Sequence, residues 1–102
     1  MKRTPLKKVG KRAKRYASGD TKFRLSVRTN AQGFCERCGE PGTEAHHYKT
    51  RATSLSLRHE PRNGVFLCTP CHRSAHAKPS EFRSWFEKTR PADLAFIRGV
   101  DL

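Results

Sequence analysis

Two Cys-x-x-Cys units in a chain with few apolar residues most constrain how this sequence can fold. Cys35 and Cys38 form the first unit, Cys68 and Cys71 the second, and hydrophobic residues make up only 34% of the 102 residues. A single domain with so small an apolar core usually needs disulfides, a metal or oligomerisation to be stable. Because two such cysteine turns can complete a tetrahedral zinc shell, we predict one domain held by structural Zn²⁺.

Histidines near the cysteines allow another interpretation. His46 and His47 follow the first cysteine pair, and His72 and His76 follow the second. Each cysteine pair could therefore join histidines in its own finger-like zinc site, which would make a non-catalytic, zinc-bound nucleic-acid-binding module. Against this, His46 and His47 are adjacent on an expected strand, where neighbouring side chains point to opposite faces. They are not expected to bind one zinc ion together.

The charge of the chain points to a polyanionic partner. The formal net charge is +13, with 22 Lys and Arg against 9 Asp and Glu, so nucleic acid is the expected partner rather than a membrane. Residues 1–19 contain eight basic residues and no acid, which predicts a flexible arm that neutralises phosphates. A nuclear-localisation signal has the same composition and stays an alternative. The basic residues predicted to bind nucleic acid here are Lys7, Lys8, Lys11, Arg12, Lys14 and Arg15.

Residues 20–102 have the patterning of a folded domain. Phe23, Val27 and Ala31 recur at helical spacing and predict a helix over 21–31, ended by Gly33. Strands are expected at 43–48 and 65–68, with a polar loop at 49–62 between them. Helices are expected at 72–77, at 80–89 with Ser80 as the cap, and at 91–98. No apolar run reaches membrane-spanning length and no leading stretch resembles a signal peptide, so a cytoplasmic protein is expected.

The histidines and the second cysteine pair resemble a known family. The order His46-His47, then Asn63, then Cys68-x-x-Cys71-His72-x-x-x-His76 is similar to that of the HNH endonuclease superfamily, the ββα-metal nucleases. The resemblance implies a small zinc-stabilised α+β fold with a treble-clef-like ββα-metal core at 33–77. A helix would precede this core, and C-terminal helices at 79–98 would follow it within a nuclease domain at 20–102.

The same resemblance implies a role for each site residue. His47 would be the base that activates the attacking water, and Asn63 would brace the loop and help to set the geometry of the base. His46 and His72 would bind the catalytic cation, with His76 as the third ligand. The residue types suit this chemistry, because a neutral imidazole can accept a proton near neutral pH, and a bound cation can stabilise the charge that develops on the phosphate.

One position departs from the family pattern. Many HNH members carry an acidic residue where His46 stands, which suits Mg²⁺, whereas three imidazoles favour a transition metal. The catalytic ion is therefore left open among Zn²⁺, Ni²⁺, Mn²⁺ and Mg²⁺. Glu44 is considered as an additional ligand or as a partner of a ligand, but is expected merely to share a strand face with His46.

The expected function is hydrolysis of phosphodiester bonds in double-stranded or branched DNA. No recognition helix for base edges is evident, so sequence preference should be weak, and the resemblance suggests a phage or mobile-element origin in a bacterial or phage-infected cell. Side chains flanking the site are expected to hold phosphates, and His59 is expected at the surface of the loop. These flanking residues are Tyr48, Lys49, Arg51, Arg58, Arg62 and Arg73. The oligomeric state is left open.

Overall fold

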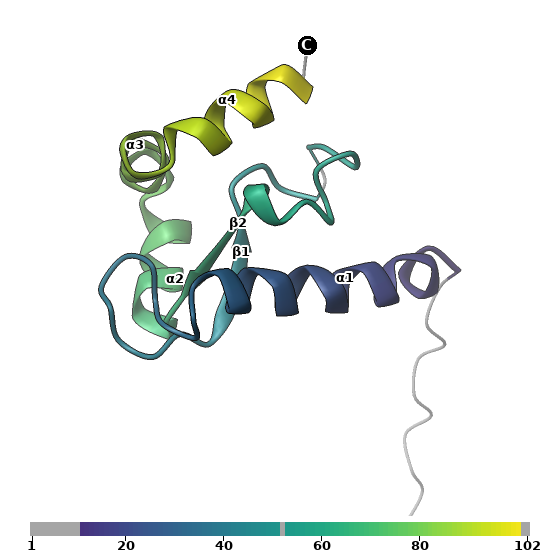
Figure 1. The fold of residues 1–102 in the computed structure, drawn as a ribbon, viewed down its shortest axis with the longest axis horizontal. Helices are drawn as coiled ribbons and strands as arrows, with labels where there is room; N and C mark the ends of the chain where they lie inside the picture. The colour runs from purple at the N-terminus through teal and green to yellow at the C-terminus, as the bar shows by residue number, and fades with distance from the viewer. Residues whose placement is uncertain (1–10, 52, 101–102) are drawn as a thin grey trace, which may run out of the picture.

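A computed structural model describes residues 11–51 and 53–100 of the chain. The described part has four α-helices and one two-stranded sheet, which confirms the predicted small α+β class (Figure 1). In chain order the elements are α1 (Lys11–Asn30), β1 (Glu44–His47), a 3₁₀ turn η1 (Pro61–Asn63), β2 (Gly64–Leu67), α2 (Thr69–Ala77), α3 (Pro79–Thr89) and α4 (Pro91–Val100). Within the described residues, no helix is long and apolar enough to cross a membrane.

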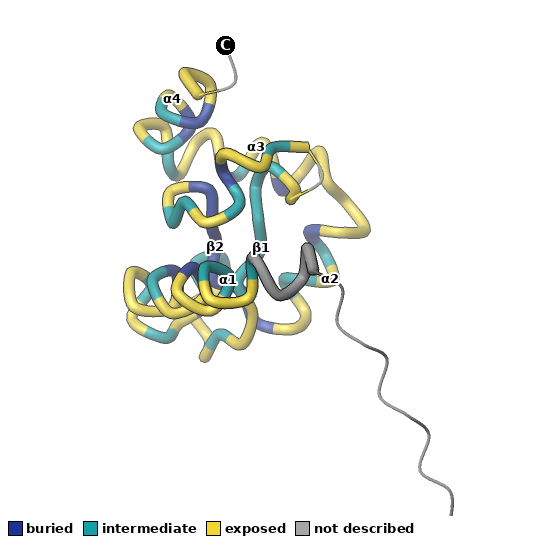
Figure 2. The backbone as a smooth tube through the Cα atoms, turned by 90° about the vertical axis from the view of Figure 1, so that its right-hand side faces the viewer, coloured by how far each residue is buried: buried dark blue, intermediate teal, exposed yellow. Residues whose placement is uncertain are grey.

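The two strands form an antiparallel hairpin whose faces have different neighbours. Glu44 pairs with Leu67, and His47 pairs with Gly64. Alternate residues point to opposite faces, so Phe66 packs toward α1, while Val65 and Leu67 join the larger core on the other side. All four residues of β2 are buried, whereas β1 is partly exposed (Figure 2). The less buried strand, β1, carries both adjacent histidines.

Helix α1 packs on one face of the hairpin through a small apolar cluster. Phe23 and Val27 are each 2% exposed and contact Phe66 of β2. A close backbone approach at Gly64 makes this possible, since a Cβ at Gly64 would lie 2.3 Å from Val27 Cγ2 and 2.7 Å from Phe23 Cζ. The absence of a side chain at this position lets the helix lie directly over β2 beside His47.

Helices α2, α3 and α4 enclose the larger core on the other face. Phe86 and Ile97 are 0% exposed, and they pack with Phe82, Leu94 and Val65. Proline stands in the first turn of each of these helices, where its missing N–H breaks no helical hydrogen bond. This core fixes α2 against the hairpin.

Several element boundaries differ from the sequence expectation. Helix α1 begins at Lys11 rather than at residue 21, so residues 11–19, which were assigned to the arm, are helical. Helix α2 begins at Thr69 rather than His72, and Pro70 stands within its first turn instead of preceding the helix. Helix α3 begins at Pro79 with Lys78 as the cap, so Ser80 is not the cap residue. The division into an arm and a nuclease domain stays a prediction.

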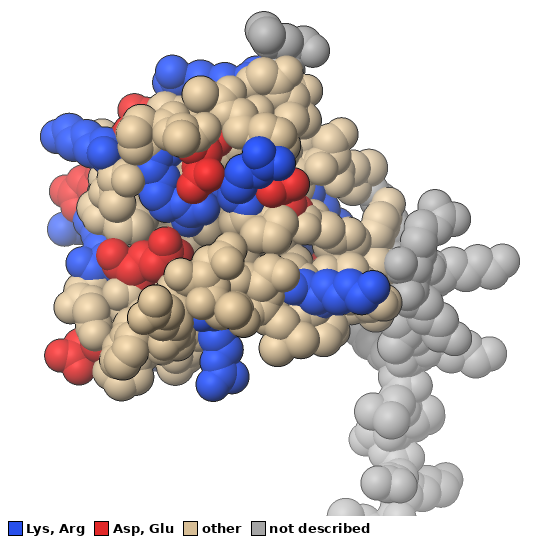
Figure 3. Space-filling view, viewed as in Figure 1, with Lys and Arg blue, Asp and Glu red and all other residues tan. Residues whose placement is uncertain are grey.

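Charged side chains of both signs meet on the side of the molecule shown in Figure 3, where Lys and Arg lie among Asp and Glu between α4 and α1. Arg90 has a side chain only 16% exposed and donates from Nε to Asp93 Oδ2 at 2.6 Å. It also donates to the carbonyl of Arg62 and lies 3.5 Å from Glu36 Oε1. Glu36 in turn accepts from the backbone N–H of Phe66 at 2.6 Å. This network ties α4 to the hairpin and to the first cysteine turn.

Candidate active site

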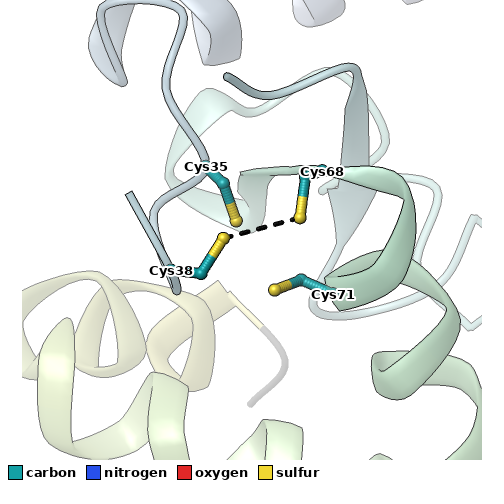
Figure 4. A group of neighbouring side chains, drawn as sticks. All are labelled: Cys35, Cys38, Cys68 and Cys71. Atoms are coloured by element: carbon teal, nitrogen blue, oxygen red, sulfur yellow. Dashed lines mark hydrogen bonds between the residues drawn. The ribbon is translucent and has the colours of Figure 1, made fainter. Parts of the chain in front are cut away.

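The four cysteines lie together at one end of the hairpin (Figure 4). Cys35 and Cys38 come from the turn after α1, while Cys68 caps α2 and Cys71 lies in its first turn. The sulfurs are all within 4.8 Å of one another, no disulfide joins them, and Cys38 Sγ is 3.6 Å from Cys68 Sγ. Tetrahedral zinc–thiolate bonds of 2.3 Å place two sulfurs about 3.8 Å apart. The cluster therefore has the dimensions of a Cys₄ metal site.

The electrostatics of the cluster also fit a cation. Burial opposes ionisation of the Cys35 thiol, but backbone N–H groups of Cys68, Cys38 and Arg37 outweigh it and lower the Cys35 pKa to about 6. Burial and the neighbouring sulfurs raise the pKa of Cys71 far above its ordinary value. Four thiolates so close together repel one another, and a divalent ion would remove that penalty.

Three histidines form a second group of metal-ligating side chains. His46 projects from β1 toward α2, where His72 and His76 lie one turn apart on the same helix face. One ring nitrogen from each lies within 4.8 Å of the others, and His72 Nε2 is 3.1 Å from His76 Nε2. Burial, with His72 and His76 adding to it, lowers the pKa of His46 to about 4, so this imidazole is neutral and able to bind a metal at pH 7.

Glu44 contacts the far nitrogen of one of these histidines. Its carboxylate Oε2 pairs with His72 Nδ1, which leaves His72 Nε2 directed at the histidine group. The sequence expectation that Glu44 merely shares a strand face with His46 was therefore incomplete. A carboxylate in this position orients the ring and increases its basicity as a ligand. Glu44 itself does not belong to the group of nitrogens that lie within 4.8 Å.

His47 points to the opposite face of β1, toward α1. Its ring stacks on Phe23 with centroids 4.2 Å apart and planes inclined by 10°. His47 Nε2 lies 2.8 Å from the carbonyl oxygen of Arg58, and a carbonyl only accepts, so Nε2 carries the hydrogen of the neutral ring. This leaves the lone pair on Nδ1. Burial lowers the pKa of His47, which favours the neutral form that can accept a proton.

Asn63 lies in η1 with its side chain fully buried. Its Oδ1 accepts from the backbone N–H of Lys49 at 2.7 Å, and its Nδ2 donates to the carbonyls of Lys49 and Leu57 at 2.9 and 3.1 Å. The two bonds to Lys49 join the ends of the loop between β1 and β2, and the bond to Leu57 holds a residue within it. The side chain of Asn63 thus braces this loop, and the functional role that the family resemblance implied for it stays a prediction.

A pocket of about 410 Å³ brings both histidine sets together along β1, between α1 and α2. His46, His72 and His76 line one part of it, and His47 lines another. Helix α1 supplies three further lining residues that were not predicted from the sequence: Asp20, Phe23 and Arg24. Two features of the sequence could have indicated them: Asp20 is a lone acid that follows a strongly basic segment, and Arg24 stands next to the core residue Phe23.

The basic residues expected to hold phosphates have different locations. Arg51 lines the pocket, and Arg73 is exposed on α2. Arg58 instead forms an ion pair with Asp20, and Arg62 pairs with Glu60. The binding roles of these arginines therefore stay predictions, and at Arg58 and Arg62 DNA would have to displace the carboxylate partners.

Aromatic and histidine residues of the loop also have partners within the protein. Tyr48 stacks on Phe86 and donates to Glu87, so it belongs to the core side of the hairpin rather than to the pocket. His59 Nε2 lies 2.8 Å from Asp20 Oδ1. Lys7 and Lys8 lie outside the described residues, as do the side chains of Lys11, Arg12, Lys14 and Arg15.

Comparison with known proteins identifies the class of this site. Residues 35–78, which contain both cysteine pairs and the three histidines of the candidate metal site, match the model of the HNH endonuclease family. This match supports a nuclease, a phosphodiester hydrolase, as the class of the protein. No curated protein matches the chain.

A solved structure has the same fold. The HNH endonuclease of the deep-sea thermophilic bacteriophage GVE2, crystallised with manganese ion, aligns with a TM-score of 0.59 and 21% sequence identity. The alignment covers 69% of this chain and 83% of the phage protein. The structural similarity therefore covers more of the chain than the 44 residues that match the family model.

Proposed function

We propose that this nuclease is a metal-dependent DNA endonuclease in which His47 is the general base. The observation that carries the proposal is the state of its ring: Nε2 is committed to the Arg58 carbonyl, and Nδ1 has no hydrogen-bond partner among the described residues. A neutral imidazole with its lone pair at the edge of a pocket can take a proton from water as that water attacks phosphorus. Its lowered pKa keeps it in this form at neutral pH.

His46, His72 and His76 would hold a divalent cation in the same pocket. The spacing of their ring nitrogens fits one ion, and imidazoles suit Zn²⁺, Mn²⁺ or Ni²⁺, with Mg²⁺ less favoured. When bound, such an ion stabilises negative charge on the phosphate oxygens and on the leaving oxygen. Glu44 would orient His72, and Zn²⁺ at the four cysteines would hold α2 against the first cysteine turn.

The substrate we propose is DNA, bound through its backbone. Arg24 of α1 and Arg51 of the loop line the pocket, so a strand crossing β1 could place one phosphate near the histidines and others near these guanidinium groups. The net charge of +13 adds non-specific, salt-dependent affinity. We propose weak sequence preference, and the cytoplasm of a bacterial or phage-infected cell as the place of action.

A plasmid-nicking assay on His47→Ala tests the proposal. Metal-stripped protein is reloaded with Zn²⁺ and then assayed with Mn²⁺, Ni²⁺ or Mg²⁺ on supercoiled DNA. Loss of the base should slow cutting by about 10²- to 10⁴-fold. Filter binding to DNA and zinc content should stay near those of the parent. A His47→Ala protein that nicks as fast as the parent would remove His47 from the mechanism, and a parent inactive with every metal on both double-stranded and branched DNA would oppose the proposed DNA-cutting activity.

A further inference from the structure

We infer that Asp20 of α1 is a positioning residue that holds His47 in its reactive orientation by anchoring Arg58. This inference rests on the proposed role of His47 as the base. It concerns an element that lies before the family-matched residues 35–78, so the match itself does not assign it. The chain of contacts runs from Asp20 to the Arg58 side chain, and from the Arg58 backbone to His47.

The first link is a bidentate ion pair between Arg58 and Asp20, which are 38 residues apart in the sequence. Arg58 Nε donates to Asp20 Oδ1 at 2.9 Å, and Arg58 Nη2 donates to Asp20 Oδ2 at 2.7 Å. Both side chains are largely shielded, at 14% and 20% exposure. The parallel arrangement fixes the orientation of the guanidinium plane as well as its distance. The hydrogen bonds from Arg58 hold the Asp20 pKa at about 2, so the carboxylate is ionised across the neutral range.

The second link joins the same residue to the base. The Arg58 carbonyl accepts from His47 Nε2 at 2.8 Å. Arg58 lies in the loop between β1 and η1, outside the sheet ladder, so the position of this carbonyl depends on how the loop is anchored. Asn63 fixes the loop on one side through the carbonyl of Leu57, and Asp20 fixes it on the other through Arg58 and His59.

A third contact shows that α1 holds the base from two directions. Phe23 stands three residues after Asp20, on the same face of α1, and stacks on the His47 ring. Stacking fixes the plane of the ring, and the hydrogen bond to Arg58 fixes its rotation within that plane. With the stacking contact and the hydrogen bond both in place, the lone pair of His47 Nδ1 points in one direction only. Asp20 also lines the pocket, but it lies outside the histidine metal group, so its contribution is expected through Arg58.

Asp20→Asn tests the inference, with Asp93→Asn as a matched control. Both aspartates pair with a shielded arginine, and their side chains are 20% and 27% exposed, but Asp93 pairs with Arg90 away from the pocket. Asparagine keeps the shape of the side chain and removes the two-pronged acceptor. We expect kcat for nicking to fall about 10- to 100-fold in Asp20→Asn, as expected when a reacting group is misplaced by about 1 Å, and to stay within about twofold in Asp93→Asn.

The KM for DNA distinguishes a positioning role of Asp20 from a purely electrostatic effect of its charge. Asp20→Asn removes a negative charge from the pocket that a polyanion enters, so electrostatics alone predicts tighter binding and no loss of rate. Positioning predicts a lower kcat with KM unchanged or lower. Retention of the parental kcat in Asp20→Asn, or an equal loss in Asp93→Asn, would overturn the inference. If Asp20→Asn folds poorly, Arg58→Lys replaces it as the test: this variant keeps the backbone carbonyl and one charged contact, and its kcat should be intermediate.

A spectroscopic readout does not depend on cutting. Long-range ¹H–¹⁵N correlation spectra of the zinc-loaded protein report which nitrogen of His47 is protonated. The parent and Asp93→Asn should show the Nε2–H tautomer, and Asp20→Asn should show a mixture of tautomers or an averaged ring. An unchanged Nε2–H tautomer in Asp20→Asn opposes the inference even if the parent does not cut DNA, whereas a His47→Ala protein of parental rate opposes the proposed function alone.

Discussion

Replacing Gly64 by Ala should separate the packing of α1 from the rest of the fold. Gly64 pairs with His47 in the hairpin, and a Cβ there would lie 2.3 Å from Val27 Cγ2 and 2.7 Å from Phe23 Cζ. Carbon atoms in contact need about 3.5 Å or more, so α1 must move by about 1 Å or its side chains must leave their preferred rotamers. We expect a loss of about 1–3 kcal/mol in unfolding free energy.

The change should also reach the chemistry, because Phe23 stacks on His47. A shift of about 1 Å at a catalytic group can cost about 10²-fold in rate. Thermal unfolding should show a Tm lower by about 4–8 °C for each kcal/mol lost, and single-turnover nicking below the transition should be slowed. Gly99→Ala is the matched control: its Cβ meets nothing within 4 Å and lies in α4, so it should be neutral or stabilise by up to about 1 kcal/mol. A Gly64→Ala protein with the parental Tm and rate would refute the close packing of α1 on the hairpin.

Two further predictions concern the histidine group. Glu44→Gln should weaken Mn²⁺ binding to the zinc-loaded protein by about 10- to 100-fold, because His72 loses the carboxylate that orients its ring. Calorimetry measures this affinity, and Glu81→Gln, which changes an exposed acid on α3, should bind Mn²⁺ like the parent. Equal Mn²⁺ affinities for Glu44→Gln and Glu81→Gln would count against the pairing of Glu44 with His72. In the protein without an ion at the histidines, the unfolding free energy should fall as pH drops from about 6.5 toward 4. The pKa of His46 is about 4 in the folded protein against an ordinary value of 6.5, so His46 binds a proton in the unfolded chain first and protonation favours unfolding. Urea titrations at several pH values should show a smaller decrease in His46→Gln, and a decrease equal to that of the parent would assign the effect to other groups.

The sequence predicts the parts of this fold that depend on local patterns. The alternation of side chains along β1 separates His46 from His47, and the structure places them on opposite faces as expected. The two Cys-x-x-Cys spacings predict the sulfur cluster that forms. The helical spacing of Phe23 and Val27 predicts the apolar face of α1.

Features that depend on distant partners were not predictable in this way. The ion pair of Asp20 with Arg58 joins positions 38 residues apart, and no periodic pattern links them. The early start of α1 has the same origin: Tyr16 lies under the Arg58 guanidinium, 4.3 Å from it, so tertiary contacts support a segment whose composition alone predicts disorder. The start of α3 could have been predicted, because a proline at residue 79 is itself a signal for the first helical turn.

Helix α2 spans only nine residues, yet Cys71 in its first turn is followed directly by His72, with His76 one turn later. In the proposed metal-loaded state, the ion at the sulfurs would fix the start of this helix and so set the direction in which its two imidazoles face. A chelator that removes the sulfur-bound ion should then abolish affinity for the other ion while every histidine is intact. Occupancy of the cysteine site would thereby govern an activity that depends on a second ion, bound elsewhere on the same helix.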